Sequence, residues 1–176
     1  SGGMLNPIDT FLYAEHELRG LRPRPAASPA VLLRRVSLDL IGLPPTIQEV
    51  DAFLADRSPN AYEKQVERVL NSPHYGERWG RHWLDVARYG DTNGYLHDLR
   101  RTGWPWRDWV VKSFNDNMQF DQFVVEQLAA DKLPPGADNH NLAALGYLTV
   151  GRKFLSRNDD FDDQVDVVTR GLLGLT

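Results

Sequence analysis

The 176-residue sequence contains no cysteine. This absence excludes disulfide bonds, thiolate metal sites, cysteine nucleophiles and thioether-linked haem within these residues. The sequence also lacks any apolar run close to the ~20 residues that a membrane-spanning helix needs, so it predicts no membrane span. Its formal net charge is −4. This value disfavours a nucleic-acid partner, because phosphate contacts need a clustered surplus of lysine and arginine.

Complete catalytic signatures are missing too. The sequence has no Gly-x-Ser-x-Gly, no His-Glu-x-x-His and no phosphate-binding P-loop. Enzyme activity is therefore left unassigned. Sustained alternation of apolar and polar residues, which marks half-buried strands, is also absent, and we expect no substantial sheet.

What the sequence does contain is a series of helix starts. A capping residue directly precedes proline at Asn6-Pro7, Ser28-Pro29, Ser58-Pro59 and Ser72-Pro73. Thr46 and Glu49 form a capping box that predicts a further start. The expected fold is all-α, with a single compact multi-helix domain of about seven to nine helices. We expect this domain to span residues 5–176 and to be truncated at its C-terminal end, and residues 1–4 to be a remnant of an expression vector.

Apolar periodicity places the expected helices and their buried faces. The helices run over about 7–19, 29–41, 47–55, 59–70, 73–89, 104–114, 121–131, 139–148 and 160–173. In the later helices the predicted core residues are Trp106, Trp109, Val110, Phe120, Phe123, Val124 and Leu128. Trp104, at the opening of its helix, is expected to be free to face a ligand.

The stretch from Ser72 to Tyr95 is the densest in aromatic and charged residues. One predicted face packs small against large residues: Gly76, Trp79, Gly80, Trp83, Val86, Ala87 and Gly90. A polar stripe beside it holds Arg78, His82, Asp85 and Tyr89 at spacings that bring side chains within mutual reach. This stripe is either an internal polar network or a ligand site with a perturbed histidine.

The turn after this helix extends the candidate site. Asp91-x-Asn93-Gly94 is similar to the opening of a calcium loop, but the closing glutamate is missing, so we predict no metal site. The candidate ligand-binding or polar site comprises Arg78, His82, Asp85, Arg88, Asp91, Tyr95, Trp104 and Arg107.

Four blocks carry a family resemblance: LRRVSLDLIGLPPT, SPHYGERWGRHWLDVARYGDTNGY, WRDWVVKSFNDNMQFDQFVVEQLAADKLP and DDQVDVVTRGLLGLT. From about Pro7 to Thr176 the chain resembles the domain of unknown function in large secreted cytochrome-c-type (PSCyt-type) proteins of planctomycetes. The resemblance implies an extracytoplasmic location, periplasmic or secreted, and other domains of the same polypeptide as partners. It also implies a Cys-x-x-Cys-His haem motif just after the segment matching Thr169 to Thr176. The full-length protein would then carry haem c, whereas this chain itself would hold no cofactor.

Three functional hypotheses follow. In the first, the domain belongs to a redox or polysaccharide-related haem protein, with His74, His82 or His97 as a distal haem ligand or proton donor. In the second, it binds or cleaves carbohydrate, with Trp104 and Tyr95 stacking on sugars and Asp85 with Asp91 as a carboxylate pair. In the third, it is a structural or partner-docking module without catalysis.

Overall fold

The computed structural model describes residues 6–92, 98, 100–134, 140–151 and 157–175. Their regular structure consists of eight α-helices and two 3₁₀ helices. Within these ranges the only β-type pairing is an isolated antiparallel bridge between Thr92 and Arg100. The all-α fold predicted from the sequence is therefore confirmed.

The first four helices are α1 (Pro7–Leu18), α2 (Pro29–Ile41), α3 (Ile47–Ala55) and α4 (Ala61–Leu70). Local hydrogen bonds explain two of their starts. Asn6 and Asp9 form a reciprocal capping box at α1, and Thr46 and Glu49 form another at α3.

The predicted start of α4 at Pro59 is wrong, because Asn60 is the N-cap. Ser58 is held by other contacts: its amide donates to Oδ1 of Asp56 at 2.8 Å, and its hydroxyl accepts from Nζ of Lys64 at 2.8 Å. Hydrogen bonding to Asp56 from the side chain and the amide of Ser58, together with Lys64, lowers the pKa of Asp56 to about 2.

The remaining elements are α5 (Pro73–Val86), α6 (Trp104–Asn115), α7 (Phe120–Ala129), η1 (Ala130–Lys132), η2 (His140–Leu148) and α8 (Arg157–Leu173). Helix α5 ends three residues before the predicted position, because Arg88 adopts a left-handed conformation with φ of 60°. The segment predicted as an apolar helix over 139–148 is a 3₁₀ helix, and α8 begins three residues earlier than predicted.

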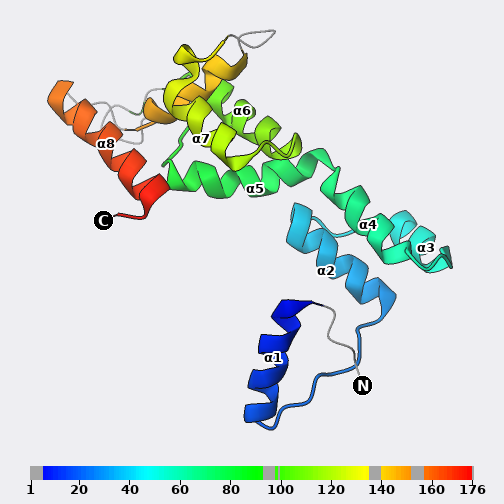
Figure 1. Ribbon diagram of the computed structural model, residues 1–176. Helices are drawn as coiled ribbons and strands as arrows, with labels where there is room; N and C mark the ends of the chain where they lie inside the picture. The colour runs from blue at the N-terminus through cyan, green and yellow to red at the C-terminus, as the bar shows by residue number, and fades with distance from the viewer. Residues whose placement is uncertain (1–5, 93–97, 99, 135–139, 152–156, 176) are drawn as a thin grey trace.

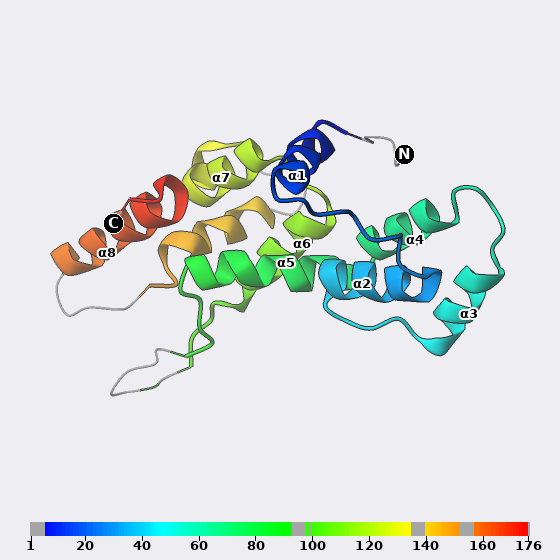
Figure 2. The same ribbon diagram turned by 90° about the horizontal axis from the view of Figure 1, so that it is seen from below.

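Helix α5 is the central element of the arrangement (Figure 1). Helices α6 and α7 cover one of its sides, α2 and α4 lie at its N-terminal end, and α8 lies at its C-terminal end. Helix α1 lies apart and buries none of its residues. In both ribbon views no described helix covers the opposite side of α5 (Figures 1 and 2).

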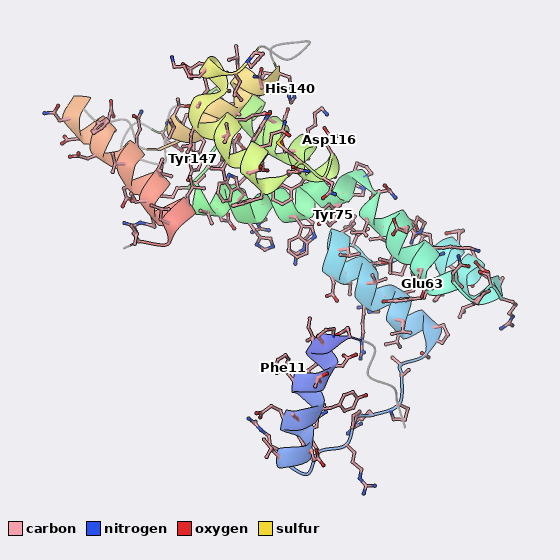
Figure 3. The ribbon with its side chains drawn as sticks, viewed as in Figure 1. Phe11, Glu63, Tyr75, Asp116, His140 and Tyr147 are labelled. Atoms are coloured by element: carbon pink, nitrogen blue, oxygen red, sulfur yellow. The ribbon has the colours of Figure 1, made fainter. Side chains whose placement is uncertain are left out.

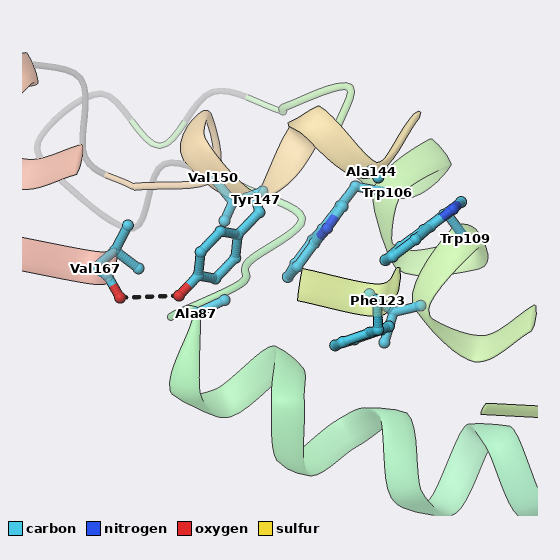
Figure 4. Packing of buried hydrophobic residues seen from close by; sticks show 9 residues of the cluster. Ala87, Trp106, Trp109, Phe123, Ala144, Tyr147, Val150 and Val167 are labelled. Carbon is cyan, nitrogen blue, oxygen red and sulfur yellow. Dashed lines mark hydrogen bonds between the residues drawn. The ribbon is translucent and has the colours of Figure 1, made fainter. Parts of the chain in front are cut away.

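The main hydrophobic core joins α5, α6, α7, η2 and α8 (Figure 4). Trp106 and Trp109 are buried there as predicted, and Phe123 stacks on Trp109 with ring centroids 5.1 Å apart. The hydroxyl of Tyr147 donates to the carbonyl of Val167 at 2.9 Å, which attaches α8 to η2. A smaller cluster holds α2 against α3 through Leu33, Val36 and Phe53.

Two residues of α7 that were predicted to be buried are exposed. Phe120 is 69% exposed and Leu128 is 37% exposed. Phe120 is the first residue of its helix, where neighbouring turns cannot cover it. Leu128 lies close to the other end of α7. Apolar periodicity marks both positions, but it does not show how far the covering helices extend.

Candidate functional site

The inner face of α5 packs closely against α6, as its predicted small residues allow. Gly76 and Gly80 are buried against α6. A Cβ atom at Gly76 would lie 2.3 Å from the carbonyl oxygen of Val111, so only glycine fits. The amide of Gly76 also donates to Oδ1 of Asn115 at 2.7 Å. This face positions α5 rigidly and leaves its other face available for function.

The outer face of α5 carries an aromatic row that the sequence did not reveal. Trp79 lies between Tyr75 and His82, with ring centroids 6.1 Å and 5.6 Å away. Its indole Nε1 donates to the carbonyl of Leu40 in α2 at 3.0 Å. Val86 continues the row one turn further. We call Tyr75, Trp79, His82 and Val86 the outer row.

Trp79 and Val86 had been predicted to pack inside, and this prediction is wrong. Trp79 is 36% exposed and Val86 is 45% exposed. Residues three or four positions apart can lie on the same face of a helix or on the face next to it. The spacing therefore assigned residues of two adjacent faces to one face. The glycines and Trp83 face α6 and α7, whereas Trp79, His82 and Val86 remain exposed. Tyr75 is half-buried at the edge between the two faces, and Val86 lies beside Gly171 of α8.

The predicted polar stripe does not form an internal network among the described residues. Arg78 turns towards Gly42 at the end of α2, where its buried Nε has no hydrogen-bond partner. His82 contacts Trp79 instead of Asp85. Asp85 is exposed. The stripe residues share one side of α5 but are not joined to one another.

Arg88 connects α5 to α8. Its Nη1 lies 3.1 Å from Oδ1 of Asp163 and 3.7 Å from Oδ2 of Asp166. A left-handed backbone is unfavourable for a residue with a Cβ atom. At Arg88 it turns the chain sharply out of the helix, and the side chain then bridges to Asp163 and Asp166 in the middle of α8. The role of Arg88 in this structure is therefore positional.

Asp91 lies in a second polar group beyond the end of α5. Its Oδ1 accepts from the Tyr89 hydroxyl at 2.7 Å and lies 3.7 Å from Nη1 of Arg107. Burial, reinforced by the hydrogen bond to Asp91 and the negative charge of that residue, raises the pKa of Tyr89 to about 12. Arg107 thus pairs with Asp91 and Asp108.

Trp104 is 54% exposed at the first position of α6, as predicted. One turn further along α6, Arg107 and Asp108 border an open polar groove of about 650 Å³ between α5 and α6. Its other lining residues are Glu77, Leu84, Val111, Lys112, Asn115 and Asp116. Tyr95 and His97, both proposed as ligand contacts, lie outside the described residues.

Arg101 is a connecting residue that sequence reasoning missed. Its guanidinium donates to three successive carbonyls, those of Thr149, Val150 and Gly151, at 3.0, 2.7 and 2.6 Å. This fork attaches the segment before α6 to the end of η2. No periodicity marks the residue, since it follows a turn and its partners lie about fifty residues away.

Two of the histidines proposed as haem ligands, His74 and His82, lie within the described residues, and both are exposed. His74 pairs with Glu77 at 2.7 Å. The described side chains include no group of three or more His, Asp or Glu that could hold a metal ion. None of the helices in the described ranges is long and apolar enough to cross a membrane.

These features define an all-α protein built on one central helix, closely packed on its inner face and aromatic on its uncovered outer face. The chain belongs to the PSCyt2 family, a protein of unknown function (DUF1549), whose model matches residues 7–176. The family resemblance found in the sequence is thereby confirmed. Comparison with curated proteins gave no match, and neither did comparison with solved structures.

Proposed function

We propose that this chain is a partner-docking scaffold in an extracytoplasmic haem-linked protein, and that the outer row of α5 is its docking surface. The observation that supports the proposal is the row itself. Tyr75, Trp79, His82 and Val86 lie along one side of the helix that organises the fold, and Trp79, His82 and Val86 remain exposed there. Aromatic residues that remain exposed together are typical of protein interfaces.

Exposed apolar side chains on other helices agree with this proposal. Large apolar side chains are exposed on α1, including Phe11, and on α8, including Phe161. A domain with this much uncovered apolar surface fits a role beside other domains of the same polypeptide.

The haem and the extracytoplasmic location rest on the family resemblance alone. Because His74 and His82 are both exposed, we propose that any haem is held by another part of the polypeptide. A polypeptide extended beyond Thr176 should then show a Soret band that is unchanged by His82→Ala. A band that shifts in this variant would make His82 a haem ligand and remove the outer row from the proposal.

Binding between separately expressed parts tests the docking role. The 176-residue chain would be titrated with the remaining domains of the intact polypeptide by calorimetry. Val86→Arg should weaken the complex at least tenfold, because it places a charge in an apolar contact. Trp104→Ala, which changes an exposed aromatic residue away from the outer row, should leave the affinity unchanged. Equal affinities for wild type and Val86→Arg would contradict the proposal.

One observation favours carbohydrate binding as a second candidate. Trp104 is exposed close to a groove whose lining mixes acids, amide and cations, which suits a sugar ring stacked on an indole. No described contact joins Asp85 to Asp91, so the argument concerns binding and not cleavage. A glycan array should show signals that Trp104→Ala removes and Val86→Arg retains. An array without signals would exclude this candidate.

A further inference from the structure

An aromatic cavity of about 270 Å³ lies between α5, α6 and the start of α7. It is lined by Tyr75, Trp83, Ser113, Phe114, Asn117, Met118, Phe120 and Phe123. Tyr75 and Asp116 mark this end of the α5–α6 pair (Figure 3). Apart from Tyr75, which lies at the edge between the two faces, the lining residues do not belong to the outer row.

The walls of the cavity are held in place by directed contacts. Nε1 of Trp83 donates to Oε1 of Gln127 at 2.7 Å, and the amide of Gln127 donates in turn to the carbonyl of Phe123 at 3.0 Å. Phe123 is buried, and its ring centroid lies 5.3 Å from Trp83 and 5.8 Å from Phe114. The floor is therefore an aromatic surface held together by hydrogen bonds and ring contacts.

The rim is fixed by the way α6 ends. Asn117 has a left-handed backbone with φ of 51°. Its amide donates to the carbonyl of Phe114, and the amide of Met118 donates to the carbonyl of Ser113 at 2.9 Å. This pair of bonds is a Schellman motif, which turns the chain back over the cavity and presents Asn117 and Met118 at its mouth.

The polar groups of the lining divide into two sets. The Ser113 hydroxyl donates to the carbonyl of Trp109, and Nε1 of Trp83 donates to Gln127. The donors of Ser113 and Trp83 therefore already have hydrogen-bond partners. The Tyr75 hydroxyl and the Asn117 side-chain amide have no hydrogen-bond partner among the described residues. The lining includes no charged side chain. The cavity therefore combines a neutral aromatic floor with two uncommitted polar groups at one end.

We infer that this cavity binds a small uncharged aromatic compound that carries a hydroxyl group. The volume supports one ring with a substituent or two fused rings, since an apolar cavity of about 150 Å³ takes up benzene. The rings of the floor favour a flat partner, by offset or edge-to-face contact. An ion would lose its hydration without gaining a countercharge, which excludes charged ligands. A ligand hydroxyl would pair with Tyr75 or Asn117.

The test uses 4-fluorophenol as the probe, observed by ¹⁹F NMR line broadening with the 176-residue chain. We expect saturable binding with a Kd of about 1 mM, as suits a ligand of this size. Fluorobenzene, which lacks the hydroxyl, should bind about five- to tenfold more weakly. 4-Fluorobenzoate should not bind. Absence of saturable binding by 4-fluorophenol, or equal binding by the benzoate, would overturn the inference.

Variants then locate the site. The double variant Tyr75→Phe/Asn117→Gly keeps the ring and tolerates the left-handed turn, and it should abolish the preference for 4-fluorophenol over fluorobenzene. Met118→Trp should fill the cavity and remove binding by both probes, with thermal melting confirming that the chain remains folded. Phe120→Ala should weaken binding at least threefold, whereas Phe11→Ala, an equally exposed phenylalanine on α1, should not. Unchanged binding in the double variant and in Phe120→Ala would show that the probe binds elsewhere.

The outcomes are separate from those of the docking proposal. Val86→Arg changes the outer row and should leave 4-fluorophenol binding intact. Phe120→Ala changes the cavity and should leave the affinity for the partner domains intact. The two proposals can therefore fail independently, and the experiments show which of them fails.

Discussion

The indole of Trp83 and the side chain of Gln127 form the polar connection between α5 and α7. The donor Nε1 lies 2.7 Å from Oε1, and Gln127 is buried. This bond satisfies a glutamine that would otherwise be costly to bury. It also fixes the ring that stacks on Tyr147 with a centroid distance of 5.7 Å.

Replacing Gln127 by methionine should destabilise the chain by about 1–3 kcal/mol, because Trp83 loses its acceptor while remaining in the core. Urea unfolding followed by circular dichroism measures the change. Gln48→Met on the exposed side of α3 serves as the matched control and should change stability by less than about 0.5 kcal/mol. Equal effects of the two substitutions would show that the Trp83 bond contributes nothing.

The two buried glycines of α5 should respond in opposite directions to alanine. A Cβ at Gly76 would meet the Val111 carbonyl oxygen at 2.3 Å, and we expect Gly76→Ala to cost at least ~2 kcal/mol. At Gly80 the nearest atom is Cγ1 of Val110 at 3.4 Å, an ordinary contact. Gly80→Ala should therefore be neutral or stabilising by up to about 1 kcal/mol. Denaturant midpoints of the two variants settle the comparison, and a reversed order would contradict the packing described for α5 and α6.

Backbone strain at Arg88 predicts that the chain is more stable with glycine at this position than with alanine. Both substitutions remove the ion pairs with α8, but only glycine relieves the positive φ of 60°. The Arg88→Gly variant should be more stable than the Arg88→Ala variant, with a free energy of unfolding higher by about 1 kcal/mol. Arg170, which pairs with Asp166 from within α8, provides the control. At position 170 the alanine variant should have a free energy of unfolding about 1 kcal/mol higher than the glycine variant, because glycine weakens a helix interior.

The raised pKa of Tyr89 predicts a loss of stability at high pH. Its pKa is about 12 in the folded chain against an ordinary tyrosine value of 10.0. The folded state therefore holds this proton more tightly than the unfolded state does. The associated stability is fully present below pH 10 and is lost as the pH rises towards 12. In urea titrations across this window, Tyr89→Phe should show a shallower decline than wild type.

Part of the loss of stability at high pH should remain in Tyr89→Phe, and we assign this part to Tyr147. Burial also raises the pKa of Tyr147, so the same sign of pH dependence should persist from that residue. Identical pH profiles for wild type and Tyr89→Phe would rule out the effect assigned to the Tyr89–Asp91 contact.

Local chemistry explains why the fold class and most helix bounds could be predicted from sequence. Caps such as Asn6 with Asp9 act over three residues, and glycine spacing at Gly76 and Gly80 marks a close approach whatever the partner. These signals are complete within one helix. Ser58 shows their limit, because a capping residue before proline was engaged by Asp56 and Lys64 instead.

The candidate site was harder to predict because it depends on which side of α5 is covered. Trp79 and Trp83 lie four residues apart, and spacing alone assigns them to one face. Contacts with α6 and α7 bury Trp83, whereas Trp79 reaches only the end of α2. The aromatic cavity likewise combines residues about forty positions apart, from Tyr75 to Phe114. No motif in the sequence encodes such a pairing.

Helix α1 behaves differently from the rest of the chain in one respect. It is 12 residues long, buries no side chain, and is supported by its capping box and an Arg19–Glu15 pair. Helices of this length are marginal in water without tertiary contacts. Its helical content should therefore decrease gradually on heating, well before the cooperative transition of the tryptophan-rich core. A binding partner that covers Ile8, Phe11 and Leu12 would stabilise this helix. Its binding would therefore be measurable as an increase in helical ellipticity.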